Sequence, residues 1–389
     1  MLGCAGKPLL LLLFDLTDMS IVSAERLRNR NLDLLRAVAI AMVVVYHAAQ
    51  TTPLLWPVTN YGEYGVDLFF VLSGWLVGGL YWRERLSFGN VHIFGFWIRR
   101  WMRTLPPYFI ALFVSWLAVY AVRRQPFDYG YLFFVQNYYT HVPFFSVSWS
   151  LCVEEHFYLL APLLLLAWQR TRKIRPTWFI LALLLAPLCR FLIYGDEYSL
   201  YFKTATHLRI EGLIVGLWLS YLSTEEPQTL RRLLTSAPYG VVAGVALLFC
   251  LALVGGRLGY TLWGTAVALF FSAALLCLLS RDDVGTRVAR VASAVSLSSY
   301  SVYLTHAWAI YAALKLVERL PDLGAVYFPL ALLLITALGV SFYYLVERPS
   351  IRIRDVLWPR RGGLGFNAPA PSPGVALNAA LATNTKSRH

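Results

Sequence analysis

The sequence predicts an all-α protein of the membrane, a polytopic bundle of about ten transmembrane helices with both termini in the cytoplasm. Three observations support this fold class. Of the 389 residues, 58% are hydrophobic and only 14% are charged, and the mean hydropathy of +0.58 is far above that of a soluble domain. Apolar runs recur from Leu32 to Val346 without a comparable soluble insert. Basic residues gather in short clusters between those runs, which is typical of topology signals.

A requirement of about 20 apolar residues per span places ten helices along the chain. Their expected ranges are 33–51, 63–81, 105–122, 149–168, 177–194, 207–222, 238–255, 259–280, 294–316 and 325–346. The basic clusters that this count assigns to the cytoplasm hold 23 Lys and Arg residues, whereas the opposite loops hold five. Because an even number of spans returns the chain to its starting side, this asymmetry predicts both ends inside.

One segment does not fit a span. Residues 128–145, DYGYLFFVQNYYTHVPFF, are too short and too polar to cross, and a crossing there would invert every later loop. We therefore expect an outer loop or a re-entrant segment rich in interfacial tyrosines.

The whole chain divides into three parts. We expect residues 1–30 to form a cytoplasmic extension, 31–349 to form one membrane domain, and 350–389 to form a tail that is basic at first and then disordered. Lys7 with PLLLLLF resembles a short signal segment, so Met1 and Met19 are both candidate starts. The five cysteines lack metal-type spacing, and no metal site is predicted. The net charge of +13 lies in short clusters, which argues against a nucleic-acid partner.

Ionisable residues inside the apolar runs are candidate functional residues, because charge at membrane depth is costly. In RNLDLLRAVAIAMVVVYH, Arg36 lies at the cytoplasmic end of the first helix. His47 follows eleven residues later, roughly 16 Å further toward the outer side. The simpler alternative for His47 is a histidine hydrogen-bonded between helices or reaching the interface.

Several other polar residues accompany His47. By topology, Asp67, Glu154, Arg209 and Glu211 fall on the same outer side, and a shared polar cavity is the simplest way to satisfy them. Ordinary explanations are a charge at a helix start for Asp67 and favourable helix-dipole positions for Glu154 and Glu155. Six residues of the second, sixth and ninth helices are therefore candidate substrate-binding residues, namely Asp67, Ser73, Arg209, Glu211, Tyr303 and His306.

A second candidate site lies on the cytoplasmic side, in HIFGFWIRRWMRTLPPYF. Arg100 and Arg103 are three residues apart on one helical face, just before an expected helix break at Pro106 and Pro107. A topology signal would explain them, but guanidinium groups also bind phosphates in bidentate fashion. The two-sided pattern suggests a phosphate-bearing donor held from the cytoplasm and a histidine with a carboxylate, able to act as a base, near the outer rim.

The sequence also resembles the acyltransferase 3 family of integral membrane O-acyltransferases. The matching stretches follow one another from Asn31 to Pro349: NLDLLRAVAIAMVVVYH, GVDLFFVLSGWLV, RRWMRTLPPYF, WSLCVEEHFYLLAP, LRIEGLIVG, SSYSVYLTH and YYLVERP. The resemblance implies a ten-helix bundle that transfers an acyl group, commonly acetyl, from cytoplasmic acyl-CoA to a hydroxyl. That hydroxyl often belongs to a sugar of an extracytoplasmic glycan or glycolipid, or to a small natural product. The family's key positions fall on Arg36, His47, Arg100, Arg103 and Glu154.

The combined expectation is a multi-pass O-acyltransferase of the plasma (inner) membrane, with acetyl-CoA as co-substrate and no permanently bound cofactor. Arg100 and Arg103, with Arg36, would hold the CoA phosphates, and His47 paired with Glu154 would deprotonate the acceptor hydroxyl. A route through acyl-His47 fits the same residues.

Other routes and functions stay open from the sequence. Some relatives carry an esterase-like domain after the last helix, and we expect no such domain here. The acyl group could therefore pass directly to the sugar or to a separate extracytoplasmic acceptor protein. The alternative function is a transporter or flippase for a glycan or glycolipid, because buried charges also mark substrate pathways. A purely structural or partner-binding membrane protein is the third reading.

Overall fold

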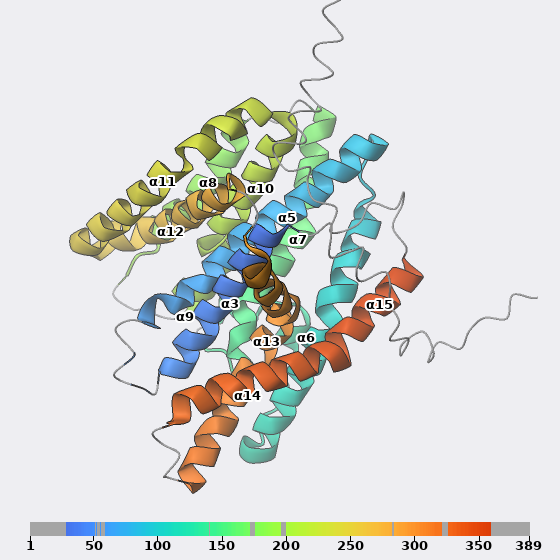
Figure 1. Ribbon diagram of the computed structural model, residues 1–389, viewed down its shortest axis with the longest axis vertical. Coiled ribbons are helices and arrows are strands. Elements are labelled where there is room, and N and C mark those ends of the chain that lie inside the picture. Colours follow the sequence, from blue (N-terminus) through green and yellow to red (C-terminus); the bar gives the residue numbers. More distant parts are fainter. Residues whose placement is uncertain are drawn as a thin grey trace, which may run out of the picture.

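The computed structural model describes residues 29–50, 52, 55, 59–139, 141–171, 176–195, 200–281, 284–320 and 326–358. Within these ranges every regular element is a helix (Figure 1). The predictions for residues 1–28, including a start at Met19, and for a disordered tail after residue 358 lie outside the described residues.

A helix occupies each of the ten expected spans. The ten helices are α3 (Arg30–Ala49), α5 (Gly65–Phe88), α6 (Ile93–Arg123), α7 (Trp149–Thr171), α8 (Pro176–Leu192), α10 (Glu211–Glu225), α11 (Pro227–Val254), α12 (Gly256–Leu279), α13 (Thr286–Arg319) and α14 (Tyr327–Phe342). Seven helical stretches, built on α3, α5, α6, α7, α11, α12 and α14, are long and apolar enough to cross a membrane. Of the remaining three, α8 is apolar but shorter, α10 has 15 residues, and α13 buries several serines.

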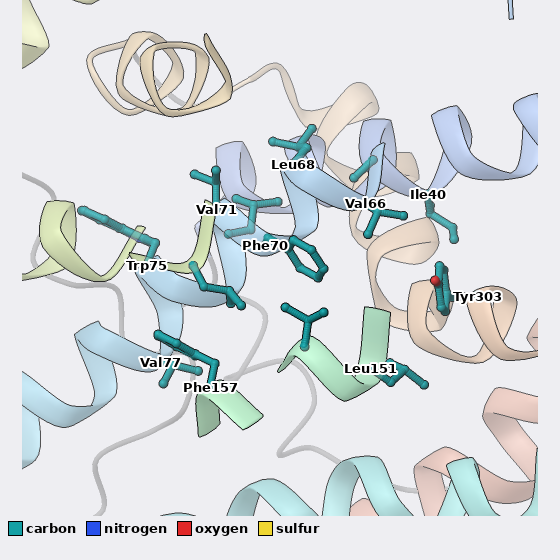
Figure 2. Packing of buried hydrophobic residues seen from close by; sticks show 14 of the residues in the cluster. Ile40, Val66, Leu68, Phe70, Val71, Trp75, Val77, Leu151, Phe157 and Tyr303 are labelled. Carbon is teal, nitrogen blue, oxygen red and sulfur yellow. The ribbon is translucent and has the colours of Figure 1, made fainter. Parts of the chain in front are cut away.

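The helices form two peripheral groups around a central one. Figure 1 shows α11 and α12 side by side at one end of the molecule and α14 at the other, with α3, α5, α7 and α13 between them. Apolar side chains of the central group interdigitate in Figure 2, among them Ile40 of α3, Phe70 of α5, Leu151 of α7 and Tyr303 of α13. The outer faces of α6, α8 and α11 expose many large apolar side chains, which suits contact with lipid.

Helix α3 is fixed at its start by polar contacts. The Asn29 side chain caps the helix by accepting hydrogen bonds from the backbone of Asn31 and Leu32. Asp33 in the first turn accepts hydrogen bonds from Ser293 (2.8 Å) and Ser296 (2.9 Å) of α13. These contacts fix the position of α3 against α13, and with it the two functional candidates that α3 carries.

Glycines allow α5 and α10 to approach closely. A Cβ at Gly74 of α5 would collide with the Leu213 backbone oxygen of α10, and a Cβ at Gly216 of α10 would collide with the Val71 oxygen of α5. Small residues of the second helix thus permit tight helix packing.

Helix α6 differs from the prediction at Pro106 and Pro107. We expected a helix break there, but α6 continues from Ile93 through both prolines to Arg123. The two prolines remove backbone donors from one turn only, and neighbouring groups can satisfy carbonyls in such a turn. The carbonyls that lose their helical donors are those of Met102 and Arg103, four residues before the prolines. The Tyr300 hydroxyl donates to the next carbonyl, that of Thr104, at 2.8 Å.

The segment after α6 forms no spanning helix in its described part, as predicted. It contains the short 3-10 turns η2 (Tyr129–Leu132), η3 (Gln136–Tyr138) and η4 (Ser146–Ser148). Tyr131 is buried, and its hydroxyl accepts backbone hydrogen bonds from Phe144 and Phe145, both at 3.2 Å. Burial raises the pKa of Tyr131 to about 12, so its hydroxyl stays protonated. The loop is therefore packed against the bundle.

The last described helices extend beyond the expected domain limit at residue 349. A π-helical turn, η7 (Tyr343–Glu347), joins α14 directly to α15 (Arg348–Leu357). The start of the basic tail is thus helical.

Candidate active site

The first candidate site is a narrow cavity of about 100 Å³ between α3, α5, α6, α7 and α13. We call it the arginine cavity, because Arg36, Arg100 and Arg103 line it together with Ser73 and Glu154. Four of these residues, the three arginines and Glu154, were predicted to be functional from their positions in the sequence. Ser73 was predicted to bind the substrate.

Arg100 is held by a small hydroxyl network. Its guanidinium donates to the Tyr158 hydroxyl and to Ser73 Oγ at 3.4 Å, and it lies 4.0 Å above the centre of the Tyr158 ring. Ser73 and Tyr158 are themselves hydrogen-bonded at 2.6 Å. Ser73 therefore lies beside Arg100 in the arginine cavity.

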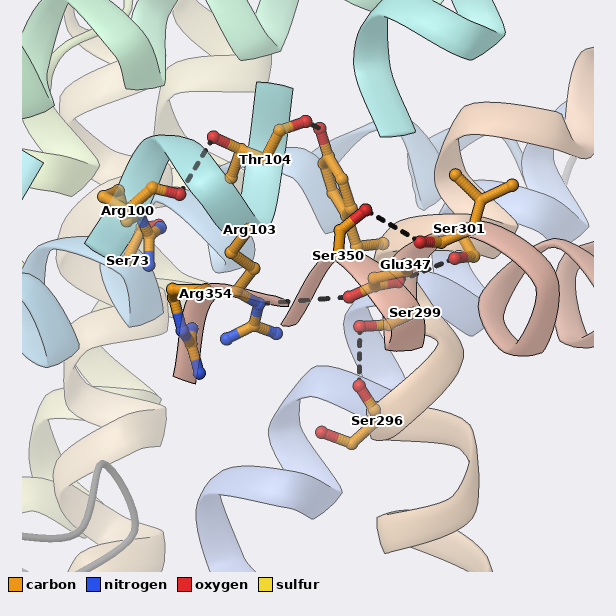
Figure 3. Close-up of polar contacts among 12 residues, drawn as sticks. Ser73, Arg100, Arg103, Thr104, Ser296, Ser299, Ser301, Glu347, Ser350 and Arg354 are labelled. Carbon is orange, nitrogen blue, oxygen red and sulfur yellow. Dashed lines mark hydrogen bonds and ion pairs between the residues drawn. The ribbon is translucent and has the colours of Figure 1, made fainter. Parts of the chain in front are cut away.

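Arg103 lies against a buried acid that the sequence predictions did not include among the site residues. Its Nε is 3.9 Å from Oε1 of Glu347, and Figure 3 shows this pair with Ser301, which donates to Glu347 at 2.6 Å. Arg36 acts on the same carboxylate electrostatically. In the sequence, Glu347 could have been recognised as the lone acid of the closing YYLVERP stretch. In the structure it ends a π-helical turn, a form that is frequent at functional sites.

The neighbouring acids Glu154 and Glu155 have different surroundings. Glu155 is buried and accepts hydrogen bonds from Thr104 Oγ1 (3.0 Å) and Trp101 Nε1 (3.1 Å). Glu154 is half-buried and lines the arginine cavity. Of the two acids, Glu154 is therefore the one placed to meet a ligand.

The second candidate site is larger, about 790 Å³, and contains His47. We call it the histidine cavity. Its polar lining includes Asp67, Arg190, Lys203 and Arg209, and its aromatic lining consists of Tyr46, Tyr64, Trp149, Tyr194, Tyr260, Trp263 and Tyr303. A volume of this size and a mixture of rings with a few polar groups are typical of small-molecule sites.

Two ion pairs order one side of the histidine cavity. Arg209 binds both carboxylate oxygens of Asp67 at 2.9 Å, as expected for residues that share a polar space. Glu211 is buried and pairs with Arg190, which also donates to the Thr261 and Leu208 carbonyls. Glu211 thus holds Arg190, and Arg190 lines the cavity. Arg190 was missed from the sequence, although it is the lone charge of PTWFILALLLAPLCRFL.

His47 has a defined tautomer. Its Nδ1 lies 2.9 Å from the Val43 carbonyl oxygen, and because a carbonyl only accepts, Nδ1 must carry the hydrogen. Nε2 is then a proton acceptor. The ring centre lies 4.9 Å from that of His306, whereas Glu154 lines the arginine cavity. The pairing of His47 with Glu154 therefore stays a prediction.

The two cavities meet at a shared wall. Val66 and Tyr303 line both of them. The Tyr303 hydroxyl donates to the Val147 carbonyl at 2.8 Å and therefore accepts from Ser150 Oγ at 2.6 Å. His306 is buried behind Tyr303, with Nδ1 2.7 Å from the Tyr303 carbonyl oxygen. Within the described residues, no group of three or more His, Cys, Asp or Glu side chains could hold a metal ion.

The described part of the chain is thus a helical bundle with seven stretches apolar enough to cross a membrane, an arginine-lined cavity and an adjoining histidine cavity. The chain belongs to the acyltransferase 3 family, whose family model, an acyltransferase domain, matches residues 29–344. The chain is accordingly a helical membrane protein of an acyltransferase family.

Curated relatives come from Staphylococcus aureus. O-acetyltransferase OatA of strain NCTC 8325 / PS 47 is 27% identical over 305 residues, which cover 71% of this chain and 49% of OatA. A protein of strain COL that also carries O-acetyltransferase in its name, SACOL0978, is 27% identical over 309 residues with the same coverage. The chain thus spans about half the length of these relatives. No solved structure matches it significantly.

Proposed function

We propose that the protein is a plasma-membrane O-acyltransferase that uses cytoplasmic acyl-CoA, with acetyl as the expected acyl group. The acceptor is a sugar hydroxyl in a cell-surface glycan, a glycolipid or a glycosylated small molecule. One observation carries the proposal: an arginine cavity suited to phosphates adjoins a histidine cavity suited to a polar ligand, with Tyr303 in both linings. The names of the relatives favour acetyl transfer.

In the proposed topology all ten helices cross the membrane, with both chain ends in the cytoplasm. The arginine cavity then faces the cytoplasm, because Arg100 and Arg103 belong to the basic cluster between the second and third spans. His47 lies more than two helical turns from Arg36 along α3, so the histidine cavity faces the opposite side.

Arg36, Arg100 and Arg103 are proposed to hold the phosphates of the donor. Guanidinium groups bind phosphate by paired hydrogen bonds, and three of them in the lining of one narrow cavity provide a strong anion-binding site. The small volume of the arginine cavity suits an extended pantetheine arm better than a nucleotide. The thioester would thereby reach the wall formed by Val66 and Tyr303.

The chemical step uses the free Nε2 of His47. Nε2 takes the proton of the acceptor hydroxyl, and the oxygen attacks the thioester carbonyl carbon. The C–S bond breaks, the acyl group stays on the acceptor oxygen, and the CoA thiolate recovers the proton. Asp67, fixed by Arg209, can orient sugar hydroxyls in the same cavity, while Glu154 lies at the donor end.

Sealed inverted vesicles supplied with radiolabelled acetyl-CoA test this function. Label is followed into lipid, glycan and protein fractions for the unmodified protein, for His47→Ala, and for His141→Ala, an exposed loop histidine that serves as control. We expect His141→Ala to transfer label normally and His47→Ala to lose about 10²–10⁴-fold in rate.

Each remaining outcome is informative. Wild-type transfer by a normally inserted His47→Ala protein would overturn the mechanism. Label that stops on the enzyme or on a second protein would show a covalent intermediate or a separate acceptor protein. Failure to bind or consume any acyl-CoA would contradict acyl transfer, and glycolipid movement across the vesicle membrane would then support the flippase alternative.

A further inference from the structure

His306 is a buried histidine that the mechanism above does not use. It lies on α13, is fully buried, and does not line either cavity. Its Nδ1 is 2.7 Å from the Tyr303 carbonyl oxygen, so Nδ1 carries the hydrogen and Nε2 carries a lone pair. Among the described residues, Nε2 has no hydrogen-bond partner. A buried acceptor without a donor is costly, and phenylalanine could fill the same space without that cost.

Among the described residues, the basic ring in contact with His306 is that of His47. The two ring centres are 4.9 Å apart with an angle of 51° between the planes, and rings at this separation can bring their edges within hydrogen-bonding distance. Both rings donate Nδ1–H to a backbone carbonyl of their own helix. Both therefore keep Nε2 as an acceptor. Such a pair has room for one additional proton, which one Nε2 can donate to the other.

We propose that His306 is the proton-relay partner of His47. After His47 Nε2 has taken the proton of the acceptor hydroxyl, the proton passes to His306 Nε2. The N–H bond on His47 breaks and the N–H bond on His306 forms, so the pair keeps a single positive charge. The proton returns by the same route to the leaving thiolate. No oxidant or further reactant is needed. The proposal rests on the acyl transfer described above.

Other ionisable groups lie on the elements packed around the pair or line the histidine cavity. They include Asp33, Arg36 and Tyr46 of α3, Glu63 and Tyr64 of η1 (Asn60–Tyr64), Asp67 of α5, Arg103 of α6, Arg190 of α8, Tyr194 after α8, Lys203 of α9 (Leu200–Thr204), Arg209 before α10, Tyr260 of α12, Tyr303 of α13, Tyr327 of α14 and Glu347 of η7. They are unchanged in the variants below, so a difference between variants reports on His306.

The first test separates proton transfer from packing. His306→Phe keeps the ring volume, and His306→Gln keeps a polar side chain, but neither can accept a proton. We expect kcat to fall about 10²–10⁴-fold in both, with the KM for acetyl-CoA unchanged, because His306 does not line the arginine cavity. His156→Gln, a histidine of α7 outside both cavities, is the matched control and should keep the wild-type kcat. A wild-type kcat in His306→Phe would overturn the relay.

The second test does not depend on activity or on the tolerance of any substitution at His306. Protein labelled with ¹⁵N-histidine is titrated with acid in detergent micelles, and the imidazole nitrogens are followed by NMR, with His47→Gln used for assignment. We expect the Nε2 signals of His47 and His306 to move together in the wild-type protein. A His306 signal that stays constant while His47 titrates fully would refute the pair. A shared titration in a protein that transfers no acyl group would refute only the proposed function.

Discussion

At the residue scale, adjacent acids on α7 differ in what they contact. The Glu155 carboxylate is fixed by two donors from α6, whereas the Glu154 carboxylate faces the arginine cavity. The difference follows from helix geometry, because neighbouring residues point about 100° apart around the axis. Adjacent positions can thus separate a ligand-facing acid from one that joins two helices.

This difference predicts opposite effects for two matched substitutions. Glu154→Gln should lower acyl transfer by at least about tenfold and leave thermal stability unchanged, since its carboxylate faces the cavity. Glu155→Gln should cost about 1–3 kcal/mol of stability, because the amide turns an NH₂ group toward the donors Thr104 and Trp101. Thermal unfolding in detergent, followed together with acetyl transfer, checks both. Loss of stability in Glu154→Gln with full activity would contradict the assignment.

Part of the site could be predicted from single residues. Arg36, Arg100 and Arg103 were predicted to hold one ligand together, and all three line one cavity. Glu154 was expected in the polar cavity of His47 but lines the arginine cavity. The ion pair of Asp67 with Arg209 also agrees with the shared polar space that was expected.

Arg190 and Glu347 were not predicted, although each is a charge within or beside an apolar run and pairs with a charge on another element. A lone charge in an apolar run reveals its cost but does not identify the helix that compensates it.

At the element scale, the close contact between α5 and α10 depends on glycines, which have no side chain to separate the two backbones. Both helices contribute glycines at points where a Cβ would meet the partner's backbone. Backbone cannot move aside as a flexible side chain can. The position of Asp67 on α5 relative to Arg209 before α10 therefore depends on this close packing.

Two glycines of α5 provide a matched pair of variants. Gly74→Ala should destabilise the protein by about 1–3 kcal/mol, as overpacking of a tight contact does. At Gly79 the nearest atom to an added Cβ is the Arg83 side-chain Nη2, at 3.9 Å. Gly79→Ala should therefore be neutral or stabilising by up to about 1 kcal/mol. Melting temperatures of the two purified variants check the prediction, and equal destabilisation of both would contradict the packing argument.

The positions of helices were more predictable than their ends. Hydropathy located all ten helices, because length and apolar content are local properties of the sequence. It misjudged α6, which continues through Pro106 and Pro107. A proline leaves only the carbonyl four residues before it without its helical donor, and hydropathy does not show whether the surrounding structure tolerates that loss.

At the scale of the whole molecule, the proposed function requires that the two cavities open on opposite sides of the membrane. α6 carries Arg100 and Arg103, whose cluster is predicted to lie in the cytoplasm. α13 is not among the seven helical stretches that are apolar enough to cross. These two helices are therefore the most informative ones for the topology.

Single cysteines on both sides of α6 and α13 test the topology. In a variant without the native cysteines, Leu86→Cys and Val288→Cys should react with a membrane-impermeant maleimide only in inverted vesicles. Tyr129→Cys and Leu320→Cys should react in intact cells. All four positions are exposed in the structure, so each pair is the other's control for reactivity. Labelling of both members of a pair from one side would show that the helix between them does not cross.

The wall formed by Val66 and Tyr303 also affects whether ions can leak through the protein and reduce the membrane potential. An elementary charge that leaks through a 100 mV potential dissipates about 2.3 kcal/mol, and a water-filled path through an enzyme would conduct such charges continuously. With Tyr303 hydrogen-bonded at both its hydroxyl and its carbonyl, the two cavities remain separate spaces in the described part of the chain. In the proposed reaction the acyl group leaves the donor side and the acceptor's proton reaches the CoA sulfur in exchange. No net charge therefore passes the wall, and the cell can modify its surface without discharging its membrane potential.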